Sequence, residues 1–162
     1  MISNLKDLEN VINSYIVKAL ELTRDEIHEV LWQKVADYYS EPVFNNELDP
    51  TEPLYYRRTE LLMNSLTASH IKNDGDFYYF DVGWDEDYLR FRYPLSTMNR
   101  YGREYSRPKG QQVLEWFNSS SHGGTVDGEH NYFDEALEEL GNEQGIINLF
   151  KQNCKKVGLP IK

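Results

Sequence analysis

The sequence has one cysteine and no long apolar run. Because Cys154 stands alone, the chain can form no internal disulfide, and nothing in it asks for an oxidising compartment. No apolar stretch approaches the roughly 18 residues that a membrane-spanning helix requires. The residues after Met1 include Ser3, Asn4 and Asp7 and show no basic region followed by an apolar one, so no signal peptide is expected. These absences predict a cytoplasmic protein.

Basic residues are few, with 17 Lys and Arg against 27 Asp and Glu and a formal net charge of −10. Nucleic-acid binding rests on concentrated Lys and Arg, so this balance disfavours a protein that wraps nucleic acid. The same charge favours solubility and opposes self-association of the free chain. The length of 162 residues fits one domain, which at this size needs no disulfide or metal to stabilise it.

Helical patterns occupy both ends of the chain. From Ser3 to Tyr39, apolar residues recur at three- and four-residue steps, and Ser3 or Asn4 can cap the start. Thr23 and Glu26 could form a capping box that opens a second helix. Because neither Gly nor Pro interrupts this stretch, one long helix is the preferred interpretation.

Shorter helices are expected over 54–66, 111–118 and 132–140, the last of them capped by Asn131. A final helix is expected to end with Gly158 as the residue that follows its C-cap.

The middle of the chain predicts strands. Segments 67–72 and 77–82 flank the turn signature Asn73-Asp74-Gly75-Asp76, which is typical of a hairpin. After a second expected turn over 83–87, residues 88–93 alternate apolar and polar side chains. The three strands of residues 67–93 therefore predict an antiparallel meander.

Together these elements predict an α+β fold, in which a long N-terminal helix and C-terminal helices pack on a small antiparallel β-meander. The chain is expected to form a single domain of residues 1–162. Residues 95–131 read as a long loop with one helical piece, and so long an irregular stretch is in most proteins either functional or disordered.

No convincing catalytic constellation is present. Serines 119–121, His122 and Asp127 put Ser, His and Asp into one loop, but a nucleophilic triad joins residues that rigid elements hold in register. The G-x-S-x-G spacing of a nucleophile elbow is absent. The chain is therefore interpreted as a binding or assembly protein and not as an enzyme.

No metal or cofactor is expected either. His122 and His130 with Asp127 and Glu129 could supply ligands, but their spacing matches no familiar zinc or iron site. His28 has no second histidine four residues away, as a helical zinc site requires, and no nucleotide-binding motif occurs. The preferred interpretation is solvated loop acids with incidental histidines.

The basic residues concentrate in one segment. Between Tyr88 and Gln111, six Lys and Arg residues stand against one acid, Glu104, a balance of +5. Three interpretations stay open: internal pairing with the acids of 74–87 and 127–143, a protein interface rich in Arg and Tyr, or a single-strand nucleic-acid groove. As an interface, the segment would act through Arg100, Tyr101, Arg103, Tyr105 and Arg107.

A short segment before the first expected strand has a distinctive spacing. Its residues are Tyr56, Arg58, Thr59, Leu62 and Ser65, with Leu61 as an alternative to Leu62. This segment resembles the motif Tyr-x-Arg-Thr-Gly-x-Leu-x-x-Ser of the tail-completion (neck) proteins of long-tailed phages, also described as minor capsid or head–tail joining proteins. The order of the expected elements is also similar. The chain departs from the motif at Glu60, where that family usually has the Gly of a sharp turn.

The resemblance implies a structural protein without substrate or cofactor, located in the host cytoplasm and then in the virion. It would join the tail end to the head–neck connector after DNA packaging, as a ring once assembled. Its partners would be other neck and tail proteins and itself, with no membrane and no sequence-specific nucleic acid. The alternatives are a small immunity or antitoxin protein, a hydrolase using His122 and Asp127, and a nucleic-acid binder acting through residues 90–109.

Overall fold

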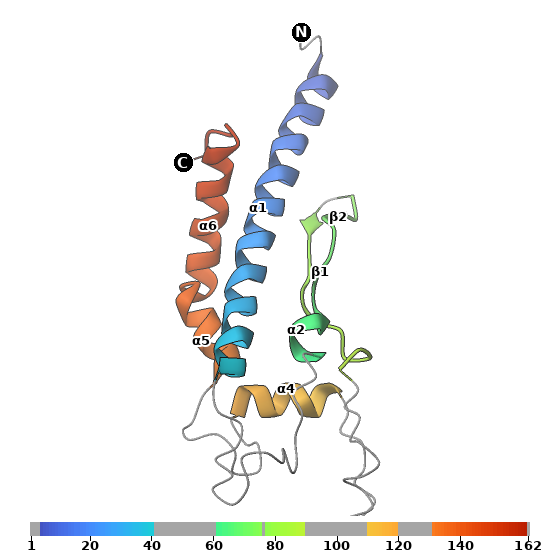
Figure 1. Ribbon diagram of the computed structural model, residues 1–162. Helices are drawn as coiled ribbons and strands as arrows, with labels where there is room; N and C mark the ends of the chain where they lie inside the picture. The colour runs from blue at the N-terminus through green and yellow to red at the C-terminus, as the bar shows by residue number, and fades with distance from the viewer. Residues whose placement is uncertain (1–3, 41–60, 76, 90–109, 120–130, 162) are drawn as a thin grey trace, which may run out of the picture. The chain divides into compact units, whose positions relative to one another are not determined.

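The computed structural model describes residues 4–40, 61–75, 77–89, 110–119 and 131–161 (Figure 1). Its elements are α1 (Leu5–Ser40), α2 (Leu61–Ser65), β1 (Leu66–Ala68), β2 (Lys72–Asn73), β3 (Tyr78–Tyr79), β4 (Val82–Trp84), α4 (Gly110–Ser119), α5 (Tyr132–Glu139) and α6 (Asn142–Lys156). A long N-terminal helix and C-terminal helices accompany two small antiparallel sheets, so the predicted α+β class is confirmed.

The chain forms two compact units, each assembled from separate stretches. Unit 1 consists of Met1–Val30, Ala68–Gly83 and Leu137–Lys162, and unit 2 of Leu31–Thr67 and Trp84–Ala136. The expectation of a single domain stays a prediction.

Helix α1 is continuous, which confirms the interpretation as one long helix. Asn4 caps its start, because Oδ1 of Asn4 accepts a hydrogen bond from the backbone N–H of Asp7 at 2.9 Å. Thr23 opens no second helix. Its hydroxyl instead donates to the carbonyl of Ala19 at 2.8 Å, and its side chain is buried. Within the described ranges, no helix combines the length and the apolar character that crossing a membrane demands.

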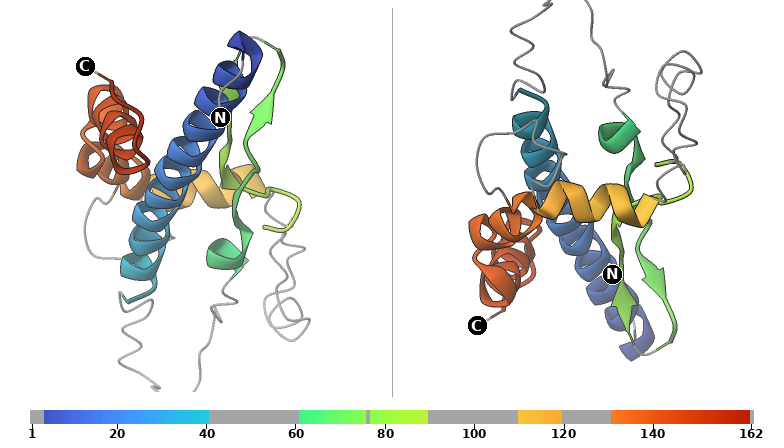
Figure 2. Two further views of the ribbon diagram at one scale, coloured as in Figure 1. Left: turned by 90° about the horizontal axis from the view of Figure 1, so that it is seen from above. Right: turned by 90° about the horizontal axis from the view of Figure 1, so that it is seen from below.

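In unit 1, helix α6 and the β-ribbon of residues 68–83 lie on opposite flanks of α1 (Figures 1 and 2). On one flank, Nδ2 of Asn153 donates to Oγ1 of Thr23 at 3.1 Å. On the other flank, the guanidinium of Arg24 donates to the carbonyl of Ser69 at 3.2 Å. Helix α1 is therefore the central element of this unit.

The predicted hairpin is present as the pairing of β2 with β3. Lys72 pairs with Tyr79 and Asn73 with Tyr78 in an antiparallel register. The turn between them needs glycine, because Gly75 has a φ of +104°. Oδ1 of Asn73 accepts the N–H of Gly75 at 2.7 Å, as is typical of an Asx turn. Strands β1 and β4 continue the same ribbon as a second two-stranded sheet.

The prediction of a third strand over 88–93 is wrong for residues 88 and 89, which are the described part of this range. Residues 86–89 form a turn, because Oδ1 of Asp85 accepts the backbone N–H groups of Asp87 at 3.0 Å and Tyr88 at 3.2 Å. Such side-chain-to-backbone bonds compete with strand pairing, so they override the alternating pattern. Strand β4 also extends into the segment that was expected to be the second turn, and the remainder of the expected strand lies outside the described residues.

The helix ends near the C-terminus follow the predicted signals. Oδ1 of Asn131 accepts the N–H of Asp134 at 3.2 Å and thereby caps α5. Gly141 and Gly158 have φ values of +76° and +91°, the left-handed conformation that separates α5 from α6 and then ends α6. Helix α4 confirms the helix expected over 111–118. Helix α2 is the end of the second expected helix, whose earlier residues lie outside the described part.

Candidate functional site

The core of unit 2 is formed by residues that lie close in the sequence to the three long segments 41–60, 90–109 and 120–130. Each core residue lies within six positions of one of these segments, and each is at most 4% exposed. The segments therefore start from and return to one packed cluster, and binding residues are often carried by segments that a rigid scaffold holds in this way. The unit 2 core consists of Val35, Leu62, Leu89, Phe117 and Tyr132, with Met63, Trp84 and Leu114 packed against it.

Aromatic rings connect the members of this core. The rings of Phe117 and Tyr132 stack with centroids 5.1 Å apart, and Trp84 meets Phe117 edge-on at 5.6 Å. Trp84 also lies 6.2 Å from the ring of Phe133. Such pairs contribute about 0.5–1.5 kcal/mol beyond the burial of their area. These ring contacts hold together the C-terminal part of α4, the start of α5 and the end of β4.

Backbone capping brings the core residues into position. The N–H of Asp85 donates to the carbonyl of Ser65 at 2.8 Å, and the turn that Asp85 caps carries Leu89 into the core. Oδ1 of Asn118 accepts the N–H of Phe133 at 3.1 Å, which ties the end of α4 to the start of α5. Local polar contacts therefore fix where segments 90–109 and 120–130 leave the core.

The predicted interface residues lie outside the described part of the chain. Segment 90–109, which carries them, is bounded on one side by buried Leu89 and on the other by α4. Both ends of segment 90–109 are therefore attached to described parts of unit 2. The interface residues concerned are Arg100, Tyr101, Arg103, Tyr105 and Arg107.

The family-motif residues divide into two groups. Tyr56, Arg58 and Thr59 lie outside the described residues. Leu62 and Ser65 are buried in unit 2, where the hydroxyl of Ser65 donates to the carbonyl of Leu62 at 2.9 Å. These two residues therefore pack the last turn of α2 and lead into β1.

The catalytic and metal hypotheses fall mostly on residues that the structure does not describe. His122, Asp127, Glu129 and His130 all lie in segment 120–130. His28 is half-buried in α1. Among the residues that are described, no group of three or more His, Cys, Asp or Glu side chains is arranged to hold a metal ion.

Unit 1 contains a buried polar pair that the sequence did not predict. Asn153 is fully buried, and its Oδ1 has no hydrogen-bond partner in the described structure, although its Nδ2 bonds Thr23. The signal in the sequence is a Thr and an Asn at apolar positions of two amphipathic helices. Next to it in the sequence, burial raises the pKa of the Cys154 thiol, which favours the protonated and less nucleophilic form.

Comparison of the chain with protein-family models, with curated proteins and with solved structures finds no match.

Proposed function

We propose that this chain is a structural protein of long-tailed phages or prophages that completes the tail end or neck. It joins the tail to the head connector by assembling as a ring through protein–protein contacts. The observation that carries the proposal is that one segment of this chain resembles the neck-protein motif. The matching residues are Tyr56, Arg58, Thr59, Leu62 and Ser65. The order of elements supports it, with a long helix before the motif, strands after it and helices at the C-terminal end.

The proposed assembly surface is the Arg- and Tyr-rich segment between Leu89 and α4. Arg and Tyr are enriched at the residues that dominate binding energy in interfaces, and a basic segment suits an acidic face on a neighbouring protein. The unit 2 core supports this role, because it anchors the chain at both ends of the segment. The interface would again consist of Arg100, Tyr101, Arg103, Tyr105 and Arg107.

In this proposal the protein binds no cofactor and catalyses no reaction. It is present in the host cytoplasm before assembly and in the virion afterwards. Its partners are other neck and tail proteins and further copies of itself.

The test is complementation of particles that lack the protein. Without it, filled heads and tails should accumulate separately, and the wild-type chain should restore joining. Charge reversal of Arg100, Arg103 and Arg107 to Glu should abolish joining, because the basic side chains would then repel an acidic partner. Electron microscopy of the particles measures the result.

The matched control replaces the same three arginines by Lys, which keeps the charge and should retain much of the joining. Circular dichroism and the unfolding midpoint should be unchanged in both variants, which separates a lost contact from a lost fold. Unimpaired joining by the Glu variant, or joined particles in the absence of the protein, would exclude the proposal.

One alternative is favoured by a specific feature. Helix α5 and the start of α6 expose Glu138, Glu139 and Glu143, and an acidic helical surface suits a small immunity or antitoxin protein that binds a basic toxin. Gene order decides between the two: a neighbouring toxin gene supports the alternative, and neighbouring portal and tail genes support the neck protein.

A further inference from the structure

Unit 1 contains no buried large apolar side chain among its described residues, which are nearly all of it. Its four buried residues are Ala19, Thr23, Asn153 and Cys154, all of them small and two of them polar. By contrast, eight of the eleven exposed large hydrophobic side chains of the described structure belong to this unit. The described large apolar side chains of unit 1 are therefore half-buried or exposed, and small units of this kind commonly gain stability from association.

The exposed apolar side chains include a continuous row on α1, here called the assembly stripe, formed by Leu5, Leu8, Val11 and Ile12. Leu5 is 84% exposed and the other three are 38% or 39% exposed. Steps of three and four residues keep Leu5, Leu8 and Ile12 on one face of a helix, and a further step of seven places Ala19 on that face.

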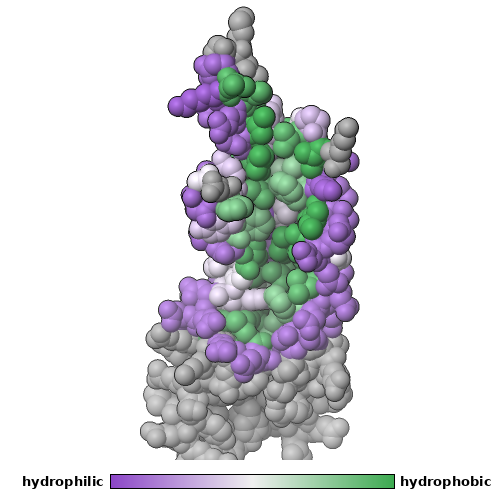
Figure 3. Space-filling view, turned by 180° about the vertical axis from the view of Figure 1, so that it is seen from behind, coloured by the Kyte–Doolittle hydropathy of each residue, from purple (hydrophilic) through white to green (hydrophobic). Residues whose placement is uncertain are grey.

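The face that carries the assembly stripe is the one that α6 covers further along. Thr23, one turn beyond Ala19, bonds Asn153 of α6, and Glu26 pairs with Lys156 at 3.0 Å. Towards its N-terminus, α1 presents the same face without α6 on it. In Figure 3, green hydrophobic surface runs along the face of the described residues that is turned to the viewer. The assembly stripe is therefore an exposed continuation of a packed helix face.

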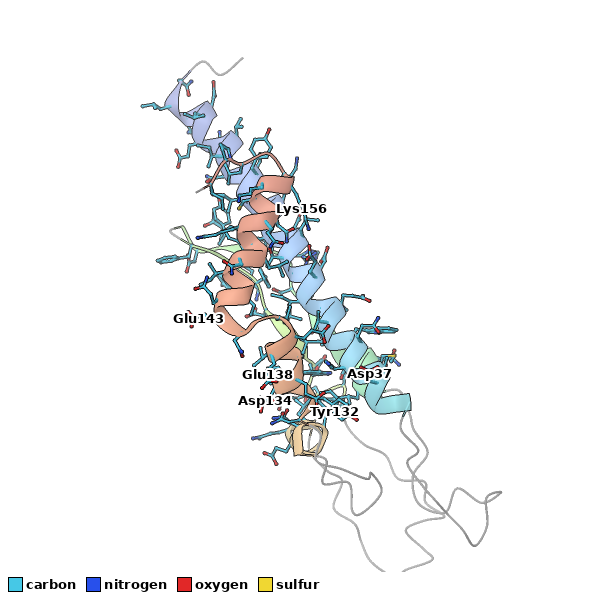
Figure 4. All side chains as sticks on the ribbon, turned by 90° about the vertical axis from the view of Figure 1, so that its left-hand side faces the viewer. Asp37, Tyr132, Asp134, Glu138, Glu143 and Lys156 are labelled. Carbon is cyan, nitrogen blue, oxygen red and sulfur yellow. The ribbon has the colours of Figure 1, made fainter. Side chains whose placement is uncertain are left out.

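Unit 1 also carries opposite charges at the two ends of α6. Its basic end has exposed Lys151 and Lys155, beside Lys156, which pairs with Glu26 of the same chain. Its acidic end has exposed Glu143, preceded by exposed Glu138 of α5. Figure 4 shows Glu138 and Glu143 near one end of α6 and Lys156 near the other. The thirteen helical steps from residue 143 to residue 156 separate these ends by about 20 Å at 1.5 Å per residue.

A surface with opposite charges at its two ends is complementary to a second copy placed head to tail. The basic end of α6 lies on the face of α1 that leads to the assembly stripe. A second copy whose acidic end approaches Lys151 and Lys155 would therefore lie over that stripe. Each copy offers both surfaces, so one contact can repeat around a ring.

We propose that the assembly stripe of one copy is covered by unit 1 of a second copy in a head-to-tail contact. In this contact Glu138 and Glu143 of the second copy face the basic end of α6. The inference rests on the proposed function and adds to it the surface through which the ring forms. Because each chain carries a net charge of −10, association depends on high local concentration.

The test is sedimentation velocity of the full chain over a concentration series at physiological ionic strength. The wild-type chain should show a sedimentation coefficient that rises with concentration. The double variant Leu8→Asp, Ile12→Asp should weaken self-association at least about tenfold, because it places charges in the apolar contact. The control is Tyr88→Asp, since Tyr88 is 49% exposed in unit 2 and its replacement should leave association unchanged.

Exchanging one charge at each end of α6 tests whether the two copies associate head to tail. Glu143→Lys and Lys155→Glu should each weaken association, and the chain that carries both should recover it, because the two charges again attract across the contact. Circular dichroism should show the same helix content in all variants.

A wild-type chain that stays monomeric at every concentration would overturn the inference. So would a stripe variant that associates as well as the control, or an exchange that fails to recover association. The particle-joining assay separates this inference from the proposed function. A chain that restores joining without associating through the stripe contradicts only the inference. A chain that associates through the stripe and restores no joining contradicts the proposed function.

Discussion

Two phenylalanines of this chain occupy opposite environments. Phe117 is 2% exposed and contacts the rings of Trp84 and Tyr132, whereas Phe77 is 69% exposed beside the turn of the hairpin. Both belong to locally apolar or aromatic runs, and propensity alone treats them alike. Their energetic roles differ because only one of them lies in a packed core.

We expect Phe117→Ala to lower the free energy of unfolding by about 3–5 kcal/mol, because it removes transfer free energy and leaves a cavity in the unit 2 core. The matched change Phe77→Ala should stay within about 0.5 kcal/mol of the wild type, since it removes only exposed surface. Urea unfolding followed by circular dichroism measures both. Equal losses would contradict the assignment of Phe117 to the core.

At the scale of elements, the pairing of α1 with α6 depends on a polar contact. Thr23 and Asn153 lie 130 positions apart in the sequence and are both buried, and their hydrogen bond lies where apolar side chains would usually pack. A buried polar pair at a helix contact favours one register over others, as polar residues do at coiled-coil seams. Its cost is the unpaired Oδ1 of Asn153.

Thr23→Val should lower the free energy of unfolding by about 1–3 kcal/mol, because it leaves the buried Nδ2 of Asn153 without an acceptor. Asn153→Leu should cost less, since it also removes the unpaired carbonyl. The double variant should cost less than the sum of the two, by at least about 0.5 kcal/mol.

Chemical unfolding of all four chains measures this cycle. The matched control is the exposed amide pair Gln144–Asn148 of α6, with 3.2 Å between Nε2 and Oδ1. Asn148→Ala should change stability by no more than about 0.5 kcal/mol. Strict additivity of Thr23→Val and Asn153→Leu would show that the two side chains are not coupled.

At the scale of the whole molecule, the two units differ in what stabilises them. Unit 2 has buried aromatic and aliphatic side chains, whereas the described residues of unit 1 bury only small ones. Helix α1 contributes residues to both units, so its first part packs among small buried side chains and its last part among large apolar ones. This contrast agrees with the two proposals made above. Unit 2 would anchor the Arg- and Tyr-rich segment, and unit 1 would be stabilised by association with a second copy.

Native-state hydrogen exchange of the dilute, monomeric chain should detect this difference. Amides near Val35 in α1 should open with a free energy at least about 1.5 kcal/mol higher than amides near Thr23, a margin that corresponds to one buried large apolar side chain. The comparison within one helix controls for intrinsic propensity. Equal protection along α1 would contradict the assignment of separate stabilities to the two units.

The sequence by itself determined the α+β class and most boundaries of the described helices, because these depend on contacts within a few residues. The bounds of the strands were not predicted in this way. The Asn4 and Asn131 caps, the turn at Gly75 and the helix end at Gly158 are all of this kind. The motif of residues 56–65 and the basic segment 90–109 were also visible without a structure, and the function drawn from them stays a proposal.

Only the tertiary structure decided which surfaces are covered. The alternation after Tyr88 predicted a strand, and the bonds of Asp85 made it a turn that buries Leu89. The apolar pattern of α1 is the same at Leu5 and at Ala19, yet one is exposed and the other buried. Periodicity fixes the direction of a side chain relative to its helix, whereas burial depends on partners more than a hundred residues away.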